Sequence, residues 1–303
     1  MFNNLEEVFV EEGNRKYSTQ DGVLYDRYKT VLYYYPPMKK DESFKVPASV
    51  VQIYNLHGKK IKRLEIPDNV KNFDYAAFFG CSALEYVKIG SGLETIDYVG
   101  EFVVEYENPF KGCNSLKRID VDKNNKYFRN DSFGVLYTYD MKNLLSVPAK
   151  VNVKEYTVPD SVTIVLDCFT NCSELEVVNF GAYVEGIATG EKDTESLVGF
   201  SECLSLREIN VSSKNPKYMS IDGVLYDKEF KELEIYPPAK EGKVYSLPKD
   251  MIYICNFAFE DNKYLEKVYL HKSVKVNHYS YYACDENGLM FDIYYEGTGE
   301  DWL

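Results

Sequence analysis

The sequence predicts a mainly β repeat protein, a solenoid of stacked short coils that carries inserted β-hairpins. Two observations lead to this prediction: a long segment recurs three times along the chain, and a shorter unit recurs five times between the long ones. A unit this short has too few apolar side chains to close a core by itself. Its copies must therefore stack on one another, as repeats of this length do.

The long segment carries an Asp-Gly-Val-Leu-Tyr motif, in full at residues 21–25 and 222–226 and in part at 134–137. A proline follows the leucine of each copy twelve residues later, at Pro36, Pro148 and Pro237. Asp-Gly between β-type residues predicts a type I′ turn, because both central residues of that turn need positive φ. We expect three β-hairpin or meander inserts, at about residues 14–37, 125–148 and 216–238.

The shorter unit reads Phe-x-x-Cys-x-x-Leu-x-x-Val/Ile-x-apolar, and its end alternates with the period of a strand. Its copies begin at Phe78, Phe110, Phe169, Phe200 and Phe259, the last with Asn262 in place of cysteine. The chain also opens on Leu5-x-x-Val8-x-Val10, the strand part of a further unit. Leu-x-x-Val-x-Ile is the strand signature of a leucine-rich repeat. Stacking predicts core ladders of Leu, Phe and Cys, with short helical turns around Phe-x-x-Cys.

The fold class is thus an α/β leucine-rich repeat, a right-handed superhelix, and we expect one solenoid domain over residues 1–303. Gly22 and Gly134 lie 112 residues apart, whereas Gly134 and Gly223 lie 89 apart. An additional coil between Pro47 and Pro67 accounts for 20 residues of this difference. The three modules are then about residues 5–121, 122–211 and 212–303.

The acidic amino-acid composition disfavours some classes of binding partner. The chain has 48 Asp+Glu against 35 Lys+Arg, a formal charge of −13, which argues against nucleic acids and anionic membranes. No apolar run approaches the 18 or so residues of a membrane helix. The N-terminus has neither a basic start nor an apolar stretch, so we expect that a signal peptide was removed or truncated.

Converging catalytic or metal-ligating groups are scarce, and we expect no enzyme, no cofactor and no metal site. His271 and His278 have no cysteine or carboxylate at ligand spacing. Asp120-x-Asp122-x-Asn124 resembles the start of a calcium loop, but Asn125 stands where that loop needs glycine. Four of the seven cysteines occupy one repeat register, which favours reduced, buried thiols, although one bridge between neighbouring coils stays possible.

The exposed sheet face supplies the candidate binding residues. In each strand, the residues that flank the inward Val or Ile point outward, because strand side chains alternate. The partner-binding candidates are Tyr86, Lys88, Arg118, Asp120, Asn179, Glu208, Asn210, Lys267 and Tyr269. The same rule places Val177, Glu7 and Phe9 on this face. Two inserted loops, at about residues 97–108 and 188–198, are the alternative site.

Several of these residues also carry a family resemblance. Pro-Asp-Asn-Val at 67–70, Tyr75-Ala76-Ala77-Phe78 and Gly80-Cys81-Ser82-Ala83-Leu84 resemble the BspA-like, Treponema-type leucine-rich repeat family. Gly112 to Leu116 and Asn171 to Leu175 repeat the pattern, and Ile293 to Trp302 is similar to the closing repeat of such proteins. The resemblance covers nearly the whole chain.

The resemblance implies a bacterial secreted or cell-surface protein without catalytic residues, whose relatives include adhesins. We therefore expect a non-catalytic, protein-binding adhesion module that is a monomer and recognises a host or microbial surface protein or glycoprotein. One alternative is a structural spacer or stalk of a larger surface protein without a ligand of its own. A glycan-binding module is another, which rests on the 28 tyrosines alone.

Overall fold

The computed structural model describes residues 4–97, 108–188, 199–255, 257–275 and 291–298. The chain forms two compact units, Met1–Asn152 with Val165–Cys172 and Val153–Ile164 with Ser173–Leu303, and each is described by itself. Both have the β-solenoid fold that the repeats predict. Among the described residues, no helix is long and apolar enough to cross a membrane.

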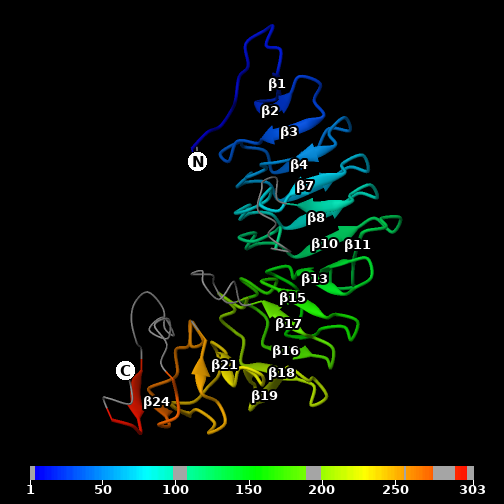
Figure 1. Ribbon diagram of the computed structural model, residues 1–303. Coiled ribbons are helices and arrows are strands. Elements are labelled where there is room, and N and C mark those ends of the chain that lie inside the picture. The colour runs from blue at the N-terminus through cyan, green and yellow to red at the C-terminus, as the bar shows by residue number, and fades with distance from the viewer. Residues whose placement is uncertain (1–3, 98–107, 189–198, 256, 276–290, 299–303) are drawn as a thin grey trace. The chain divides into compact units, whose positions relative to one another are not determined.

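In the first unit, each coil contributes one strand to each of two sheets, and the coils follow one another in chain order from blue to green in Figure 1. One sheet is parallel and consists of β4 (Ser43–Lys45), β6 (Arg63–Ile66), β8 (Tyr86–Ile89) and β10 (Arg118–Val121). The other begins with an antiparallel meander and continues in parallel strands. Its strands are β1 (Tyr17–Gln20), β2 (Val23–Asp26), β3 (Val31–Tyr34), β5 (Gln52–Ile53), β7 (Asn72–Asp74) and β9 (Thr95–Asp97).

A second antiparallel meander follows β10 in the same unit. It consists of β11 (Phe128–Asn130), β12 (Leu136–Thr138) and β13 (Asn143–Ser146), and β15 (Ile164–Leu166) lies beside β13.

The second unit repeats this plan with two short parallel sheets and a third meander. The parallel sheets are β14 (Glu155–Thr157), β16 (Val177–Phe180), β18 (Glu208–Val211), and β22 (Val244–Ser246), β24 (Lys267–Leu270), β25 (Asp292–Tyr295). The meander is β19 (Tyr218–Ile221), β20 (Val224–Asp227) and β21 (Glu232–Ile235), with β23 (Tyr253–Ile254) parallel to β21. The short strand β17 (Gly186–Ala188) lies between β16 and β18 in the sequence. The three predicted meander inserts are thus confirmed.

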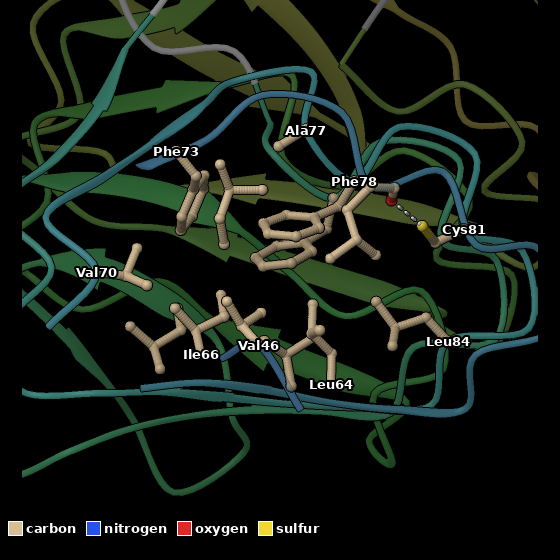
Figure 2. Close-up of a cluster of buried hydrophobic side chains, with 14 of the residues drawn as sticks. Val46, Leu64, Ile66, Val70, Phe73, Ala77, Phe78, Cys81 and Leu84 are labelled. Atoms are coloured by element: carbon tan, nitrogen blue, oxygen red, sulfur yellow. Dashed lines mark hydrogen bonds between the residues drawn. The ribbon is translucent and has the colours of Figure 1, made fainter. Parts of the chain in front are cut away.

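The core between the two sheets is a set of ladders, as expected from the repeats. In the first unit the rings of Phe78 and Phe110 stack with centroids 5.4 Å apart, and both side chains are buried. Figure 2 shows Phe78 among apolar side chains of its own coil, such as Leu84, and of the neighbouring coil, such as Leu64. The Cys81 thiol donates to the carbonyl of Leu56 at 3.0 Å. Burying each aromatic ring stabilises the fold by about 1.5–3 kcal/mol.

The expected short helical turns are wrong: no helix occurs in the described residues, and isolated hydrogen-bonded turns take their place. The Cys81 N–H donates to the Phe78 carbonyl at 3.2 Å, and the Leu84 N–H donates to the Cys81 carbonyl at 2.9 Å. The residue before each ladder Cys or Asn has a positive φ of 60–77°, and a left-handed residue interrupts a right-handed helix. These residues are Gly80, Gly112, Asn171, Glu202 and Asp261.

The Asp-Gly turns have the geometry that the sequence predicts. Asp21 and Gly22 have φ of 51° and 73°, and Asp222 and Gly223 have φ of 50° and 73°. Positive φ at both central residues is the requirement of a type I′ turn, which joins the antiparallel strands without splaying them.

Each meander also docks against the leucine-rich repeat strand that precedes it through one recurring bond. Ile119 N–H donates to the Gly134 carbonyl at 3.2 Å, and Ile209 N–H donates to the Gly223 carbonyl at 2.8 Å. A Cβ at Gly134 would lie 2.6 Å from Cγ of Arg118, so only glycine fits there. The meanders therefore stand beside β10 and β18, where those parallel sheets end.

Candidate binding surface

The structure divides the nine candidate residues among three sheets, so they do not form one row. Four lie together on β8 and β10 of the first unit: Tyr86, Lys88, Arg118 and Asp120. Three lie on β16 and β18 of the second unit: Asn179, Glu208 and Asn210. The last two, Lys267 and Tyr269, lie on β24. The division arises because a meander follows β10 and β18 in place of another parallel strand.

The group on β8 and β10 is held by direct contacts. Tyr86 donates its hydroxyl hydrogen to Asp120 Oδ2 at 2.9 Å, and Arg118 Nε donates to Asp120 Oδ1 at 2.7 Å. The guanidinium carbon of Arg63 lies 4.3 Å from the centre of the Tyr86 ring, within the range of a cation–π contact. Arg118 Nη1 donates to the carbonyl of Ser132 in the meander at 2.8 Å. We call Arg63, Tyr86, Arg118 and Asp120 the Tyr86 cluster.

The electrostatics of the cluster keep the phenol protonated. Partial burial raises the pKa of Tyr86 above its ordinary value, and the hydrogen bond to Asp120 and its charge add to this rise, whereas Arg63 and Arg118 oppose it. The cluster therefore offers a partner one neutral ring, two guanidinium groups and one carboxylate in fixed positions. Tyr and Arg are the residue types that most often dominate protein–protein binding energy.

A second outward row runs across the same sheet. In register it contains Lys45, Glu65, Lys88 and Asp120, so that charges of opposite sign alternate from strand to strand. Lys45, Glu65 and Lys88 are exposed. Opposite charges on directly facing residues stabilise a sheet weakly, and they leave no stripe of a single sign that would suit a polyanion.

The outward amides of the β14–β16–β18 sheet bond to their own neighbours. Asn179 Nδ2 donates to Glu155 Oε1 at 2.7 Å and to Thr157 Oγ1 at 3.1 Å, and Asn210 Nδ2 donates to Asn179 Oδ1 at 3.1 Å. The prediction that Val177 is exposed is wrong, since it is buried. In register, Val177 lies between Glu155 and Glu208, whose side chains are longer than its own.

On the last sheet two rings stack on each other. The Tyr269 and Tyr294 centroids lie 4.9 Å apart with planes at 19°, and Lys267 Nζ lies 5.6 Å from the Tyr294 centre. Tyr269 is 40% exposed and Tyr294 is 41% exposed, so their rims face solvent.

One feature of the surface escaped the sequence reasoning: the residue just before each of the strands β4, β6, β8 and β10, β14, β16 and β18, and β22 and β24 is charged, and its sign alternates from coil to coil within each of these three parallel sheets. Lys62 Nζ lies 2.9 Å from Glu42 Oε1, and Lys117 Nζ lies 2.7 Å from Glu85 Oε2. We call this set the ion-pair column; its members are Glu42, Lys62, Glu85, Lys117, Lys154, Glu176, Arg207, Lys243 and Glu266. Comparing the signs at this position between successive repeats would have found it.

The residues that could suggest catalysis or metal binding have structural partners. His271 Nε2 lies 2.9 Å from the carbonyl of Met251, and His57 Nδ1 lies 3.0 Å from the carbonyl of Phe79. His278 lies outside the described residues. Asp120 bonds to Tyr86 and Arg118, and Asp122 Oδ1 accepts the Asn124 N–H at 2.9 Å. Within the described part of the chain, no group of His, Cys, Asp or Glu could hold a metal ion.

The described cysteines are free thiols. They are Cys81, Cys113, Cys168, Cys172, Cys203 and Cys255, and all but Cys255 are buried. Burial first, and then the neighbouring Cys81, raise the pKa of Cys113 well above its ordinary value, so that thiol stays protonated and unreactive. The predicted loop sites fall largely on residues 98–107 and 189–198, which lie outside the described residues.

Fold and surface together define a leucine-rich repeat solenoid with meander inserts. The family model of the BspA type leucine-rich repeat region matches six copies, over residues 49–142, 148–220 and 240–291. These matches cover more than half of the chain, and the protein therefore belongs to the BspA-type leucine-rich repeat family.

Solved structures are similar in fold at low sequence identity. The pneumococcal vaccine antigen PcpA is 15% identical with a TM-score of 0.50, over 98% of this chain and 82% of that one. A leucine-rich repeat protein from Eubacterium ventriosum is 15% identical with a TM-score of 0.43, over 86% of each chain. A leucine rich cell surface protein from Faecalibacterium prausnitzii is 15% identical with a TM-score of 0.39, over 96% and 98% of the two chains. No curated protein sequence matches this chain.

Proposed function

We propose that the protein is a non-catalytic binding module of a bacterial cell-surface or secreted protein, and that it recognises a protein or glycoprotein through the β4–β6–β8–β10 sheet. The Tyr86 cluster carries this proposal. Its ring lies between Arg63 and Asp120, on a rigid sheet backed by the core ladders. Preorganised side chains of this kind lose little conformational entropy when a partner binds.

The family supports the placement at the surface, and the concave or flat faces of stacked repeats are their usual binding surfaces. The mixture of ring, guanidinium and carboxylate groups suits a protein partner, which presents both charges and apolar groups, better than it suits a polyanion.

The test is a binding screen of the monodisperse protein against matrix proteins, mucins and glycans at physiological salt, followed by variants. Tyr86→Ala removes the ring that Arg63 covers and the hydroxyl that donates a hydrogen bond to Asp120. We therefore expect the affinity for the partner to fall about 10- to 50-fold. Tyr183→Ala is the matched control, because Tyr183 is 63% exposed on another unit. Circular dichroism should be unchanged in both variants.

Equal affinity of Tyr86→Ala and the wild-type protein would contradict the use of this sheet and move the site to the inserted loops. Tyr269→Ala tests the last sheet in the same assay.

A structural spacer is the second candidate function, and the β14–β16–β18 sheet favours it. There the outward amides of Asn179 and Asn210 already bond within the sheet, so they offer a partner fewer free donors. A spacer predicts no saturable binding across the whole screen, whereas a glycan-binding module predicts hits among the oligosaccharides alone.

A further inference from the structure

We propose that residues 5–10 form an open edge that accepts an extended, basic strand of a partner protein, which would add to this edge as a parallel β-strand. This site is separate from the Tyr86 cluster and does not depend on it. β10 and β18 of the same chain occupy equivalent positions and show what an occupied edge of this kind looks like.

The inner side of the edge makes the same backbone hydrogen bonds as β10 and β18. Val8 N–H donates to the Gly22 carbonyl at 2.9 Å, as Ile119 and Ile209 do to the glycines of their own meanders. Met38 N–H donates to the Leu5 carbonyl at 3.0 Å, as Lys150 and Ala239 N–H groups do to Leu116 and Leu206 at 2.7 Å each. Residues 5–10 are thus held in the position that β10 and β18 occupy in their modules.

The outer side of residues 5–10 differs from that of β10 and β18 in its backbone hydrogen bonds. Beside β10, the N–H groups of Lys117 and Asp122 donate to carbonyls of the β8 coil at 2.9 and 2.8 Å, and their counterparts beside β18 donate to the β16 coil at 2.9 Å. The corresponding groups are those of Glu6 and Glu11, for which the described residues supply no acceptor. Residues 5–10 accordingly have no partner strand among the described residues.

Apolar side chains along this edge remain partly exposed. Leu5 and Val8 are half-buried, whereas their counterparts Leu116 and Ile119 are 1% and 0% exposed beneath the preceding coil. Phe9 is 81% exposed. A strand with alternating apolar residues would cover Leu5 and Val8 as β8 covers β10, and its carbonyl groups would accept hydrogen bonds from the N–H groups of Glu6 and Glu11.

The asparagine that opens each meander gives independent support. Asn125 Nδ2 donates to the carbonyls of Gly90 and Leu93 at 3.0 and 3.1 Å, which belong to the turn after β8. Asn14 occupies the same place, and its Oδ1 accepts the N–H groups of Lys16 and Tyr17 at 2.9 and 3.0 Å. Its amide group is positioned to donate to the turn of an incoming strand.

The ion-pair column indicates the charge of the occupant. Glu6 stands at the column position in the open edge, directly after Leu5. Every adjacent pair within the column has opposite signs, so the incoming segment should carry Lys or Arg just before its strand. Glu7 adds a second negative charge on the outward side, and both carboxylates are exposed.

A second copy of this chain does not meet this requirement. The last parallel strand among its described residues is β25, at an edge of its sheet, and the residue there in register with Glu266 is Phe291. A buried phenylalanine offers Glu6 no counter-charge. The sequence around β6, with Lys62 and Arg63 ahead of Leu64, does have the required form, and it provides a probe.

The test uses a labelled synthetic peptide of residues 59–71 and the whole protein, with fluorescence anisotropy and amide hydrogen exchange as readouts. We expect saturable binding that slows exchange at residues 6–11. A peptide with Lys62→Glu and Arg63→Glu should bind about tenfold more weakly, with the difference shrinking at high salt. The protein variant Glu6→Lys with Glu7→Lys should reverse this preference. Glu7→Lys is tolerated sterically, because Arg118 occupies the equivalent place beside Gly134.

Three results would overturn the proposal. One is the absence of protection at residues 6–11 at any peptide concentration; another is equal affinity for both peptides in both proteins. The third is concentration-dependent self-association that protects the same residues, since this would make a second copy the occupant. Sedimentation of the protein alone separates that case, and unchanged circular dichroism shows that the variant is folded.

Discussion

The first and third meanders have nearly the same sequence, yet they differ in burial because, among the described residues, a preceding coil packs beside the third meander and none packs beside the first. Tyr17 and Tyr218 occupy equivalent positions; Tyr17 is 42% exposed, and Tyr218 is 4% exposed. In the third module the Tyr218 hydroxyl accepts the Ile187 N–H at 3.2 Å from the preceding coil. A repeat of this kind thus completes its core only when another coil lies against it, as expected for a solenoid whose stability resides in its interfaces.

The asparagines show the same contrast in hydrogen bonds. Asn215 Nδ2 donates to the carbonyls of Gly181 and Val184 at 3.1 and 2.8 Å, and its Oδ1 accepts the N–H groups of Lys217 and Tyr218 at 2.9 and 2.8 Å. Asn215 is 1% exposed. Among the described residues, the Asn14 side chain makes the two acceptor bonds alone, and Asn14 is exposed.

Of the substitutions that test this comparison, Asn215→Ala should lower the free energy of unfolding most. It leaves two carbonyls and two N–H groups without partners in a buried site, so the free energy of unfolding should fall by about 2–4 kcal/mol. Asn14→Ala should cost only about 0.5–1 kcal/mol, because water replaces the lost bonds. Urea denaturation measures both.

Asn125→Ala is the matched control for that pair, since Asn125 is 2% exposed and also bonds to the preceding coil. It should resemble Asn215→Ala. Equal losses of unfolding free energy in Asn14→Ala and Asn215→Ala would show that hydrogen bonds to the preceding coil do not stabilise the protein, and would contradict the comparison.

A smaller effect concerns Asp26, which closes the turn between β2 and β3. Partial burial raises the pKa of the Asp26 carboxyl, but the N–H of Val31 and the hydroxyl and N–H of Thr30 outweigh this, so its pKa lies below the ordinary value of 3.8. A carboxyl whose pKa is lowered by folding stabilises the protein above its unfolded pKa, and this contribution disappears as the pH falls through the folded pKa.

Asp26→Asn should therefore cost about 0.5–1 kcal/mol at pH 7 and progressively less below about pH 4. Urea denaturation of the variant and the wild-type protein across that range measures the difference. A loss that is the same at pH 3 and pH 7 would mean that the charge of Asp26 has no part in holding the turn.

Much of the fold was predictable because the sequence repeats specify which positions stack in the core and where the turns lie. The Phe78 and Leu84 positions recur at fixed spacing, and Asp21-Gly22 between β-type residues specifies its turn. The left-handed conformation of Glu202 and Asp261 was not predictable. Both have φ near 60°, yet neither is glycine, the residue type that adopts this conformation without steric cost.

The candidate surface was predicted less completely. Alternation along a strand identified Tyr86 and Asp120 as outward, but the contact of Tyr86 with Arg63 depends on strand register between coils. The separation into three sheets depends on where each meander docks, which is set by backbone bonds such as that from Ile209 to Gly223. Spacing along the sequence contains neither piece of information.

The most direct test of the central claim, that an equivalent strand forms only beside a preceding coil, is amide hydrogen exchange of the free protein at residue resolution. The N–H groups of Glu6 and Glu11 should exchange rapidly, whereas those of Lys117 and Asp122, which donate to the β8 coil at 2.9 and 2.8 Å, should be protected by at least about a hundredfold. Comparable protection at all four positions would contradict the account, because the edge at residues 5–10 would then already be covered.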